Sequence, residues 1–423
     1  MAAILANRGA GRPYHAGMTA THDVVIIGGG LVGASLAIAL EGSGLDVAMV
    51  EAAPATAMPA VFDERNLSFA DATVNALTAL GVMQRLRAPT GAIVRIHVSR
   101  RGDFGRVLLE AKDHGREAFG QVVVARDFGE ALESRLSDVT GLERHRGTRF
   151  TGFAPDADGC RVLELAGEGP LRLRARLVVA ADGAASGVRD ALGIATTRHD
   201  YDQVLTVARL TAARAPDGTA YERLGDDGPT ALLPRGDRAW GLVHGVAAAE
   251  AQAVQALDDA GFLARVQDAF GWRLGRLRSV GPRSAYPAVA VRAAATVAAR
   301  AVLVGNAAQS IHPVGAQGFN LGLRDALILA ELLVSCAREG GDPGGDALLQ
   351  AHGARRREDR GRTLDFSHGL ARLTSNPGHG ASLLRGAGLV ALAALPGLQA
   401  AIAGGAMGYR GDVPAACRGG GPR

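Results

Sequence analysis

The pattern of apolar and polar residues is most regular near the N-terminus. Residues 24–27 are four consecutive β-branched side chains, which is typical of a parallel strand buried on both faces. After a glycine cluster, the segment ASLAIALEGSG has helical periodicity, with Gly42 and Gly44 near its end. The run DVAMVE, which ends at Glu51, predicts a second strand. The pattern therefore predicts a strand, a helix and a strand, the first unit of an α/β fold.

Three glycines between the first strand and the helix have the spacing G-x-G-x-x-G. They are Gly28, Gly30 and Gly33. In a dinucleotide-binding unit, the first glycine allows a tight turn, the second allows the backbone to approach a pyrophosphate, and the third allows close helix packing. The helix N-terminus adds unpaired N–H groups and a partial positive charge. Glu51 stands where an acid accepts hydrogen bonds from a ribose hydroxyl. We expect a dinucleotide here; the alternative is a glycine-rich turn without a ligand.

Two later segments have the same order of apolar strand, polar turn and helix. In residues 176–194 the apolar run is followed by Asp182 and Gly183. In residues 301–333 it is followed by a glycine-rich loop and a long helical pattern. Elsewhere, runs such as AIVRIHVSR and RAWGLVHGV alternate, which predicts strands of an antiparallel sheet.

Composition narrows the class of protein. The chain has 423 residues, and its hydrophobic share of 48% is enough for a large core. The formal net charge is only +4, and the arginines are scattered, so no binding to nucleic acid is expected. The cysteines, Cys160, Cys336 and Cys417, have no metal-ligand spacing, and no metal site is predicted. Residues 1–17 lack the uninterrupted apolar core of a signal peptide and are interpreted as a disordered tail.

Together, the three strand–turn–helix segments resemble the three fingerprints of the class A flavoprotein monooxygenases of the para-hydroxybenzoate hydroxylase type. Within that group, residues 62–82, 270–287 and 305–326 are similar to the ubiquinone-biosynthesis FAD-dependent hydroxylases, the family of 2-polyprenyl-6-methoxyphenol hydroxylase. The likeness runs from about Asp23 to about Tyr409. One local departure is that the family pattern has Ala-Gly before Gln317, whereas this chain has Gly315-Ala316.

The resemblance implies a set of residues that bind FAD. Asp182 and Gly183 would bond ribose or pyrophosphate groups, and Asn306 the ribityl chain. The 313–320 loop would wrap the isoalloxazine ring, and the following helix would direct its positive end at the edge where reduced flavin is anionic. The full set is Gly28, Gly30, Gly33, Glu51, Arg65, Arg126, Asp182, Gly183, Asn306, Pro313, Gly315, Gln317, Gly318, Phe319 and Asn320.

Two residues have a second interpretation. Arg126 matches an arginine that supports FAD from a neighbouring helix; its alternative role is a solvent-exposed arginine at a helix N-terminus. His312 lies beside the flavin loop, where it would be able to move a phenol proton, but we favour a histidine bonded to nearby backbone. No catalytic acid or base is assigned.

The implied reaction uses FAD, O2, and NAD(P)H or another electron donor. One oxygen atom of O2 would be inserted into a polyprenylated phenol in ubiquinone biosynthesis, through a flavin C4a-hydroperoxide, without a metal or a protein nucleophile. One alternative is a flavoprotein monooxygenase or reductase of similar fold that acts on another aromatic or prenyl substrate. Another is a non-catalytic scaffold bound to other subunits of a ubiquinone-biosynthesis complex.

The implied fold is an α/β fold. Its Rossmann-like FAD-binding domain comprises residues 18–88, 119–195 and 290–365. An interleaved α+β substrate domain on an antiparallel sheet comprises residues 89–118 and 196–289, and C-terminal helices comprise residues 366–423. The arginine run at 355–362 is interpreted as a solvated helix face.

An uncharged segment at residues 386–409 raises the question of a membrane. Its length would span a bilayer, but it is rich in Ala and Gly, contains Gln399, and is interrupted by Pro396 and Gly397. It predicts two short helices that pack on the body of the protein or lie on a membrane surface, in preference to a span. The expected location is the cytoplasm, either free or peripheral on the inner membrane.

Overall fold

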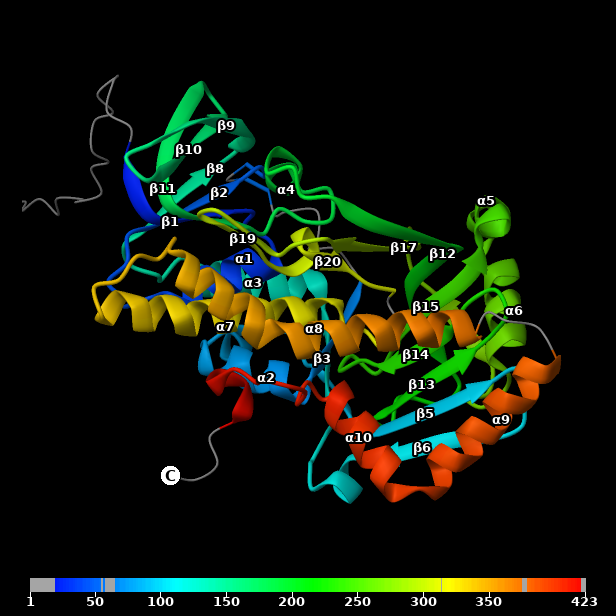
Figure 1. The fold of residues 1–423 in the computed structure, drawn as a ribbon. Coiled ribbons are helices and arrows are strands. Elements are labelled where there is room, and N and C mark those ends of the chain that lie inside the picture. Colours follow the sequence, from blue (N-terminus) through cyan, green and yellow to red (C-terminus); the bar gives the residue numbers. More distant parts are fainter. Residues whose placement is uncertain (1–19, 55, 58–64, 313, 375–378, 420–423) are drawn as a thin grey trace, which may run out of the picture.

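A computed structural model describes residues 20–54, 56–57, 65–312, 314–374 and 379–419. Within these residues the strands form three sheets, and helices pack around them (Figure 1). The predicted tail at residues 1–17 and Pro313 lie outside the described residues. The α/β fold class and the antiparallel second sheet are confirmed.

The first sheet is built on the unit predicted at the N-terminus. Its order is β18-β19-β11-β1-β2-β8, with β10 and β9 continuing from β11. The pairs of β1 with β11 and β2, of β11 with β19, and of β2 with β8 are parallel. Because the chain runs outward from β1 on both sides, the strand order switches between β1 and β11, the place where such sheets bind ligands. The strands are β1 (Thr21–Ile27), β2 (Val47–Glu51), β8 (Leu142–Arg146), β9 (Arg149–Ala157), β10 (Cys160–Ala166), β11 (Pro170–Ala180), β18 (Val297–Ala298) and β19 (Ala301–Leu303).

Two apolar cores cover the two faces of this sheet. Val24 and Ile26 of β1 pack on one face with the helices α1 (Leu31–Ala39), α3 (Ala125–Leu136) and α7 (Gly318–Arg338). Val25 and Ile27 pack on the other face, against β10 and the adjoining residues. Since side chains alternate along a strand, an unbroken apolar run is what a strand buried on both faces requires.

The second sheet has nine strands and is antiparallel except where β13 pairs with β5. Its order is β20-β17-β12-β15-β14-β13-β5-β6, and β16 also pairs with β12. These strands are β5 (Arg95–Arg100), β6 (Arg106–Glu110), β12 (Thr196–Ala212), β13 (Thr219–Leu224), β14 (Thr230–Pro234), β15 (Trp240–Ala247), β16 (Leu277–Val280), β17 (Ser284–Ala293) and β20 (Gln309–Ser310). A small third sheet consists of β3 (Asn66–Ala70), β7 (Gly120–Val124) and β4 (Gly91–Ile93).

Helices surround the sheets. One face of the second sheet packs on α6, where Phe262 and Phe270 contact Trp240 and its neighbours. The helices are α1 (Leu31–Ala39), α2 (Asp71–Ala79), α3 (Ala125–Leu136), α4 (Gly187–Ala191), α5 (Ala251–Gln255), α6 (Asp259–Phe270), α7 (Gly318–Arg338), α8 (Asp346–Thr374), α9 (His379–Ala394) and α10 (Pro396–Ala406). Short 3-10 turns lie at Met83–Arg85, Ala111–His114, Ala248–Glu250, Gly305–Ala307 and Ala415–Arg418.

Two segments differ in detail from the sequence pattern. The run AIVRIHVSR is divided at Val94, because β4 pairs with β7 of the small sheet while β5 pairs with β6 and β13. β20 belongs to the antiparallel sheet, although its residues fall within the range assigned to the FAD-binding domain. The chain therefore passes between the two sheets more often than the motifs indicate.

The prediction of a solvated face for the arginine run at 355–362 is wrong for its central residues. Arg356 is 2% exposed and Asp359 is 0% exposed. The long helices α7 and α8 lie side by side (Figure 1), and Arg324 of α7 donates two hydrogen bonds to Asp359, at 2.6 and 3.2 Å. Arg356 donates to Asp359 at 2.8 Å and to Asp325 at 2.7 Å. A run of charged residues in the sequence does not reveal which of them will be buried and paired with a charge on another helix.

These pairs compensate for a large desolvation penalty. Burial alone would raise the pKa of Asp359, but Arg324 and Arg356 lower it, so the carboxylate stays ionised. The network continues to Gln309, whose side-chain amide N–H donates to Asp325. The side-chain oxygen of Gln309 accepts from Arg360 at 2.6 Å. Arg360 also donates to the backbone oxygens of Ala293 and Ala308, each at 3.2 Å. Helix α8 thus holds the segment between the 3-10 turn at 305–307 and β20.

The C-terminal helices follow the predicted break at Pro396. No single described helix is long and apolar enough to cross a membrane. The segments Arg385–Ala394 and Pro396–Ala406 reach that length and hydropathy only when they are taken together, and the chain bends by 97° between them. Leu389, Leu392 and Ala403 pack on the side of the second sheet that carries β5 and β6. Arg385 anchors α9 by donating to Asp103 at 2.8 Å.

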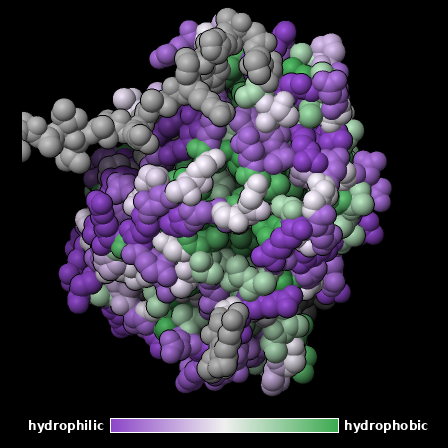
Figure 2. Space-filling view, turned by 90° about the vertical axis from the view of Figure 1, so that its left-hand side faces the viewer, coloured by the Kyte–Doolittle hydropathy of each residue, from purple (hydrophilic) through white to green (hydrophobic). Residues whose placement is uncertain are grey.

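Large apolar side chains reach the surface at several described positions. On the face in Figure 2, hydrophobic side chains gather around a central hollow that hydrophilic side chains surround. On the α9–α10 pair, Val390, Leu395 and Leu398 are 48%, 54% and 44% exposed. Apolar side chains at the bend therefore remain in contact with solvent.

Replacing Asp359 should strongly destabilise the protein. In Asp359→Asn, Arg324 and Arg356 lose the charge that compensates their burial, and the free energy of unfolding should fall by about 3–5 kcal/mol. Urea unfolding monitored by circular dichroism measures the change. Glu358→Gln is the matched control, since the Glu358 side chain is 56% exposed and should change stability by less than about 0.5 kcal/mol. Equal effects of the two variants would contradict the structural role assigned to Asp359.

Candidate active site

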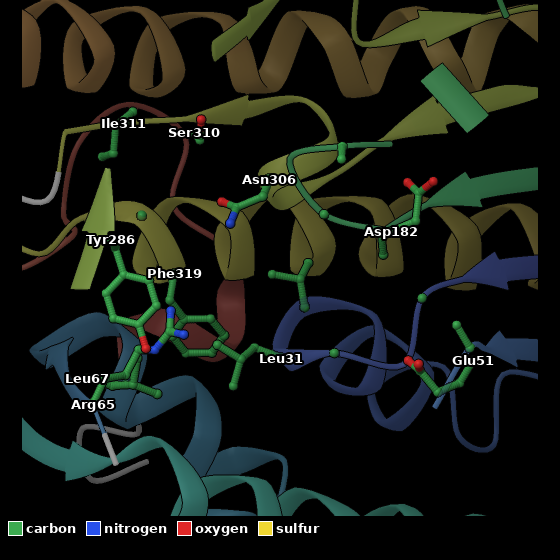
Figure 3. A pocket seen from close by; sticks show the side chains of 18 of the residues that line it. Leu31, Glu51, Arg65, Leu67, Asp182, Tyr286, Asn306, Ser310, Ile311 and Phe319 are labelled. Carbon is green, nitrogen blue, oxygen red and sulfur yellow. The ribbon is translucent and has the colours of Figure 1, made fainter. Parts of the chain in front are cut away.

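A cavity of about 820 Å³ begins at the carboxyl ends of β1 and β11 and reaches the face of the antiparallel sheet. Figure 3 shows Glu51 and Asp182 at one end and Arg65, Leu67 and Tyr286 at the other. Asn306 and Leu31 lie between them. The cavity thus joins the polar strand ends of one sheet to the second sheet.

The turn after β1 permits a very close approach of backbone segments. Gly28 has φ of +107°, and a Cβ built on it would lie 2.4 Å from the carbonyl oxygen of Ala181. A Cβ on Gly33 would lie 1.9 Å from the carbonyl oxygen of Gly28. No side chain fits at either position, so the two glycines bring α1 and β11 together at the cavity. Gly30 is the N-cap of α1 and offers no side-chain cap to its first N–H groups.

Glu51 is fixed at the end of β2. Its two carboxylate oxygens accept from the backbone N–H groups of Gly29 and Ala53, each at 2.7 Å. This orientation places the carboxylate in the wall of the cavity while each oxygen keeps capacity for a further donor. A vicinal diol such as that of ribose supplies such donors.

Asp182 has an unfilled hydrogen-bonding position. Its Oδ2 accepts from the N–H of Val188 at 3.2 Å, but its buried Oδ1 has no partner among the described residues. Burial raises the pKa of Asp182, and the Ser186 hydroxyl and Val188 N–H oppose this shift. A buried carboxylate oxygen without a donor is costly, which indicates that a ligand donor completes the site.

The loop before α7 carries two consecutive left-handed residues. Gly315 has φ of +74° and Ala316 has φ of +50°. The order Gly-Ala, the one departure from the family pattern, therefore places a Cβ where glycine is favoured, at a cost of about 1–2 kcal/mol. The helix begins at Gly318, within the range predicted as the 313–320 loop, and Gly318 and Phe319 line the cavity. Its N-cap, Gln317, makes no side-chain cap, so the first N–H groups of α7 lack that partner.

Two predicted ligands of FAD make protein contacts instead of lining the cavity. Asn320 is 1% exposed; it accepts from Ala70 N–H at 2.9 Å and donates to the oxygens of Ser68 and Ala316 at 3.0 and 2.8 Å. Gln317 donates to the Ala406 carbonyl of α10 at 3.1 Å. Asn320 therefore fastens the loop to β3, and Gln317 fastens it to the C-terminal helices.

The far end of the cavity has an aliphatic wall, with one arginine stacked on a tyrosine beside it. Leu205 and Val207 of β12, Leu233 of β14 and Val243 of β15 form its aliphatic wall. Arg65 lies over the ring of Tyr286, with its guanidinium carbon 4.4 Å from the ring centroid (Figure 3). This end suits a neutral, largely hydrophobic molecule.

The comparisons with known proteins agree on one family. The family model described as "FAD binding domain" matches residues 21–367. The ubiquinone hydroxylase UbiL of Rhodospirillum rubrum is 35% identical over 355 residues, which cover 84% of this chain and 82% of that protein. The chain belongs to the FAD-dependent hydroxylases of the ubiquinone-biosynthesis family.

More distant relatives extend the likeness. The 3-demethoxyubiquinol 3-hydroxylase of Escherichia coli is 29% identical over 359 residues, covering 80% of this chain and 86% of that protein. The crystal structure of p-nitrophenol 4-monooxygenase PnpA from Pseudomonas putida DLL-E4 has a TM-score of 0.76 at 19% identity, covering 93% and 99% of the two chains. This structural likeness shows the fold of the flavoprotein monooxygenases, and the family shows that FAD is the cofactor of the chain.

The cavity fits this family's cofactor. Asp182 Oδ1 and Glu51 offer acceptors, while the N-termini of α1 and α7, which have no side-chain cap, offer backbone donors for an anionic group. Among the described residues, no group of three or more His, Cys, Asp or Glu is placed to hold a metal ion. The predicted residues that line the cavity are Gly28, Gly30, Glu51, Arg65, Asp182, Gly183, Asn306, Gly318 and Phe319.

The remaining predicted residues lie elsewhere. Gly33 acts through packing, and Gly315, Gln317 and Asn320 shape the loop without lining the cavity. Arg126 is also outside the cavity wall; its side chain is 54% exposed and lies 3.8 Å from Asp127. For Arg126, this placement favours the alternative role at the helix N-terminus.

His312 is bonded to nearby backbone, as favoured from the sequence. Its Nδ1 accepts from the N–H of Val314 at 3.2 Å. Burial lowers the pKa of His312 to about 4, so its ring is neutral near pH 7. It does not line the cavity.

Sequence reasoning missed several lining residues. Thr148, just before β9, and Arg149 and Phe150, the first residues of β9, border the cavity where no motif marks them. Tyr286 lies in a segment that the resemblance singled out, but its orientation depends on the register of β17 with β12, which pairs it with Leu205. The sequence does not indicate this strand register, so it could not show that Tyr286 faces the cavity.

Removing the Asp182 carboxylate should weaken FAD binding. A hydrogen bond to a charged group contributes about 1.5–3 kcal/mol, so the Kd for FAD in Asp182→Ala should rise about 10- to 100-fold. Titration of the apoprotein with FAD, followed by flavin fluorescence, measures the Kd. Asp182→Asn should show a smaller loss, and Asp158→Asn, at a side chain that is 85% exposed, should leave the Kd unchanged. An unchanged Kd in Asp182→Ala would remove this residue from the cofactor site.

Proposed function

We propose that the chain hydroxylates the ring of a polyprenylated phenol in ubiquinone biosynthesis. One oxygen atom of O2 enters the ring as a hydroxyl group, and the other leaves as water, with two electrons from NAD(P)H or another donor. The observation that carries the proposal is the single cavity that joins FAD-type strand ends to an aliphatic wall.

The family relatives support the substrate class. The R. rubrum protein is named a ubiquinone hydroxylase, and the E. coli protein is named for hydroxylation of a demethoxyubiquinol. The aliphatic wall formed by Leu205, Val207, Leu233 and Val243 matches a substrate that is mainly hydrocarbon. No carboxylate or ammonium group lies among these four positions, so this part of the wall favours an uncharged ring or prenyl group.

The chain's own residues position and shield the reacting groups. Bound FAD supplies the redox chemistry that activates O2. Glu51 and Asp182 would hold hydroxyl groups of the cofactor, and the N-terminus of α7 would favour negative charge on it. The aliphatic wall would exclude water near the substrate, which limits the loss of O2-derived oxidising equivalents as hydrogen peroxide.

The bend between α9 and α10 has the character of a membrane-contact surface. Leu395 and Leu398 are exposed there, and residues 386–409 carry no charged side chain. An apolar, uncharged corner gains free energy by entering the interfacial region of a bilayer, where a polyprenylated substrate dissolves. We infer peripheral contact of this corner with the inner membrane.

The reaction is tested with the purified protein, FAD, NAD(P)H, a prenylated methoxyphenol and ¹⁸O2. The expected result is a product that carries one ¹⁸O in a new hydroxyl group, identified by mass spectrometry. Val207→Gln should raise KM for this substrate without changing the Kd for FAD, because Val207 lies in the apolar wall. Leu108→Gln, at a residue 46% exposed on β6, is the control.

Other results would favour the alternatives. Bound flavin that yields only hydrogen peroxide with the prenylated phenol would favour another aromatic or prenyl substrate. A protein that takes up no FAD would contradict the enzyme assignment and favour the scaffold.

Membrane contact is tested by flotation with phosphatidylglycerol–phosphatidylcholine vesicles. The wild-type protein should float, and Leu395→Glu with Leu398→Glu should reduce the floated fraction severalfold, because each charge must be desolvated at the interface. Trp272→Glu is the matched control at an apolar side chain 71% exposed on the α6–β16 connection. If all variants float equally, the α9–α10 corner is not the contact.

A further inference from the structure

A buried histidine and a buried glutamine join the two sheets beside the cavity. His312 is 1% exposed and Gln203 is 6% exposed. The Nε2 of His312 lies 3.2 Å from the Oε1 of Gln203, while its Nδ1 accepts from Val314 N–H. An imidazole whose Nδ1 accepts must carry its proton on Nε2, so His312 donates to Gln203. The neutral ring at pH 7 preserves this arrangement.

Gln203 reaches His312 because β12 is irregular at this point. The register of β12 with β17 shifts between Asp200 and Val204, and Asp202 has φ of +54°. Such an irregularity redirects the side chains that follow it. Beyond it, Leu205 and Val207 of the same strand form part of the apolar wall of the cavity.

His312 is also held by α8 and adjoins both the cavity and the flavin loop. Its carbonyl accepts from the hydroxyl of Ser367 at 3.0 Å. Ser310 and Ile311, immediately before it, line the cavity. Val314, whose N–H it binds, leads through the left-handed residues Gly315 and Ala316 to the start of α7. His312 therefore lies between the substrate wall and the residues that face the cofactor.

We propose that His312 and Gln203 are a positioning pair that holds residues 314–317 in register with β12. Neither residue lines the cavity, and both ring nitrogens of His312 already have protein partners, so the pair acts on the site through the loop and not as an acid or base. Placement of the α7 N-terminus then depends on the strand that forms the substrate wall. The statement that the loop faces FAD rests on the proposed function. The hydrogen-bonded link between His312 and Gln203 is independent of it.

Leucine and asparagine variants separate the two hydrogen bonds. Gln203→Leu removes the acceptor of His312, and His312→Leu removes both bonds. His312→Asn retains an oxygen that can accept from the N–H two residues later, but it is too short to reach Gln203. His244→Leu is the matched control, because His244 is 3% exposed, bonds Thr230 at 2.9 Å, and has its pKa lowered to about 4 by burial, yet it belongs to the core that packs on α6.

Hydrogen exchange of a peptide covering residues 314–320 in the apoprotein is the first measurement. Gln203→Leu and His312→Leu should each increase exchange by about tenfold or more, as expected for the loss of a buried hydrogen bond. The double variant should exchange no faster than His312→Leu, and His312→Asn should lie between the wild type and His312→Leu. His244→Leu should not change exchange in this peptide beyond its effect on the whole protein.

The holoprotein gives a second readout. Addition of the prenylated phenol should perturb the visible spectrum of bound flavin in the wild type, and Gln203→Leu should reduce that perturbation while raising the peroxide share of consumed O2. Unchanged exchange in Gln203→Leu, or additive effects of the two leucine substitutions, would overturn the positioning pair. Because exchange is measured without cofactor or substrate, a failure of hydroxylation would contradict the proposed function and leave this result standing.

Discussion

The close contact between the turn after β1 and the end of β11 is the constraint on which the site depends. Gly28 and Gly33 allow backbone to meet backbone where any Cβ would overlap a carbonyl oxygen. This contact fixes the N-terminus of α1, the carboxylate of Glu51 and the turn at Asp182 within one small region. Because the strand order switches at the same place, the space above these strand ends stays open for a ligand.

A second level of order comes from contacts between distant parts of the chain. Helix α8 supports the residues before β20 through Arg360, and Asn320 fastens the start of α7 to β3. Gln317 adds a bond to the Ala406 carbonyl of α10, so the loop before α7 and the residues that flank it receive restraints from α8, β3 and α10. Such over-determination explains how Ala316 is kept in a left-handed conformation that an isolated loop would avoid.

The sequence was sufficient where local spacing specifies geometry, and insufficient where tertiary packing decides. The strand at Val24–Ile27, the glycine turn, Glu51 and Asp182 follow from spacing, and each lies where that spacing predicts. Arg356 and Asp359 could not be distinguished from their exposed neighbours, because their burial depends on α7. Asn320 was expected to meet the flavin, but its amide can equally satisfy backbone groups, and only the path of β3 reveals that it does. Tyr286 required a strand register that no motif encodes.

The guanidinium and carboxylate groups between α7 and α8 also limit how this protein can change over generations. The protein stays stable with an intact ion pair, or with a pair of apolar residues of similar volume in its place. A single unpaired charge buried between the helices would lower the stability much more than either arrangement. Arg324, Arg356 and Asp359 share hydrogen-bond partners, so replacing one of them alone leaves a buried charge unpaired. Substitutions in this layer must therefore arise together, and homologous chains should differ here by the exchange of whole sets of side chains.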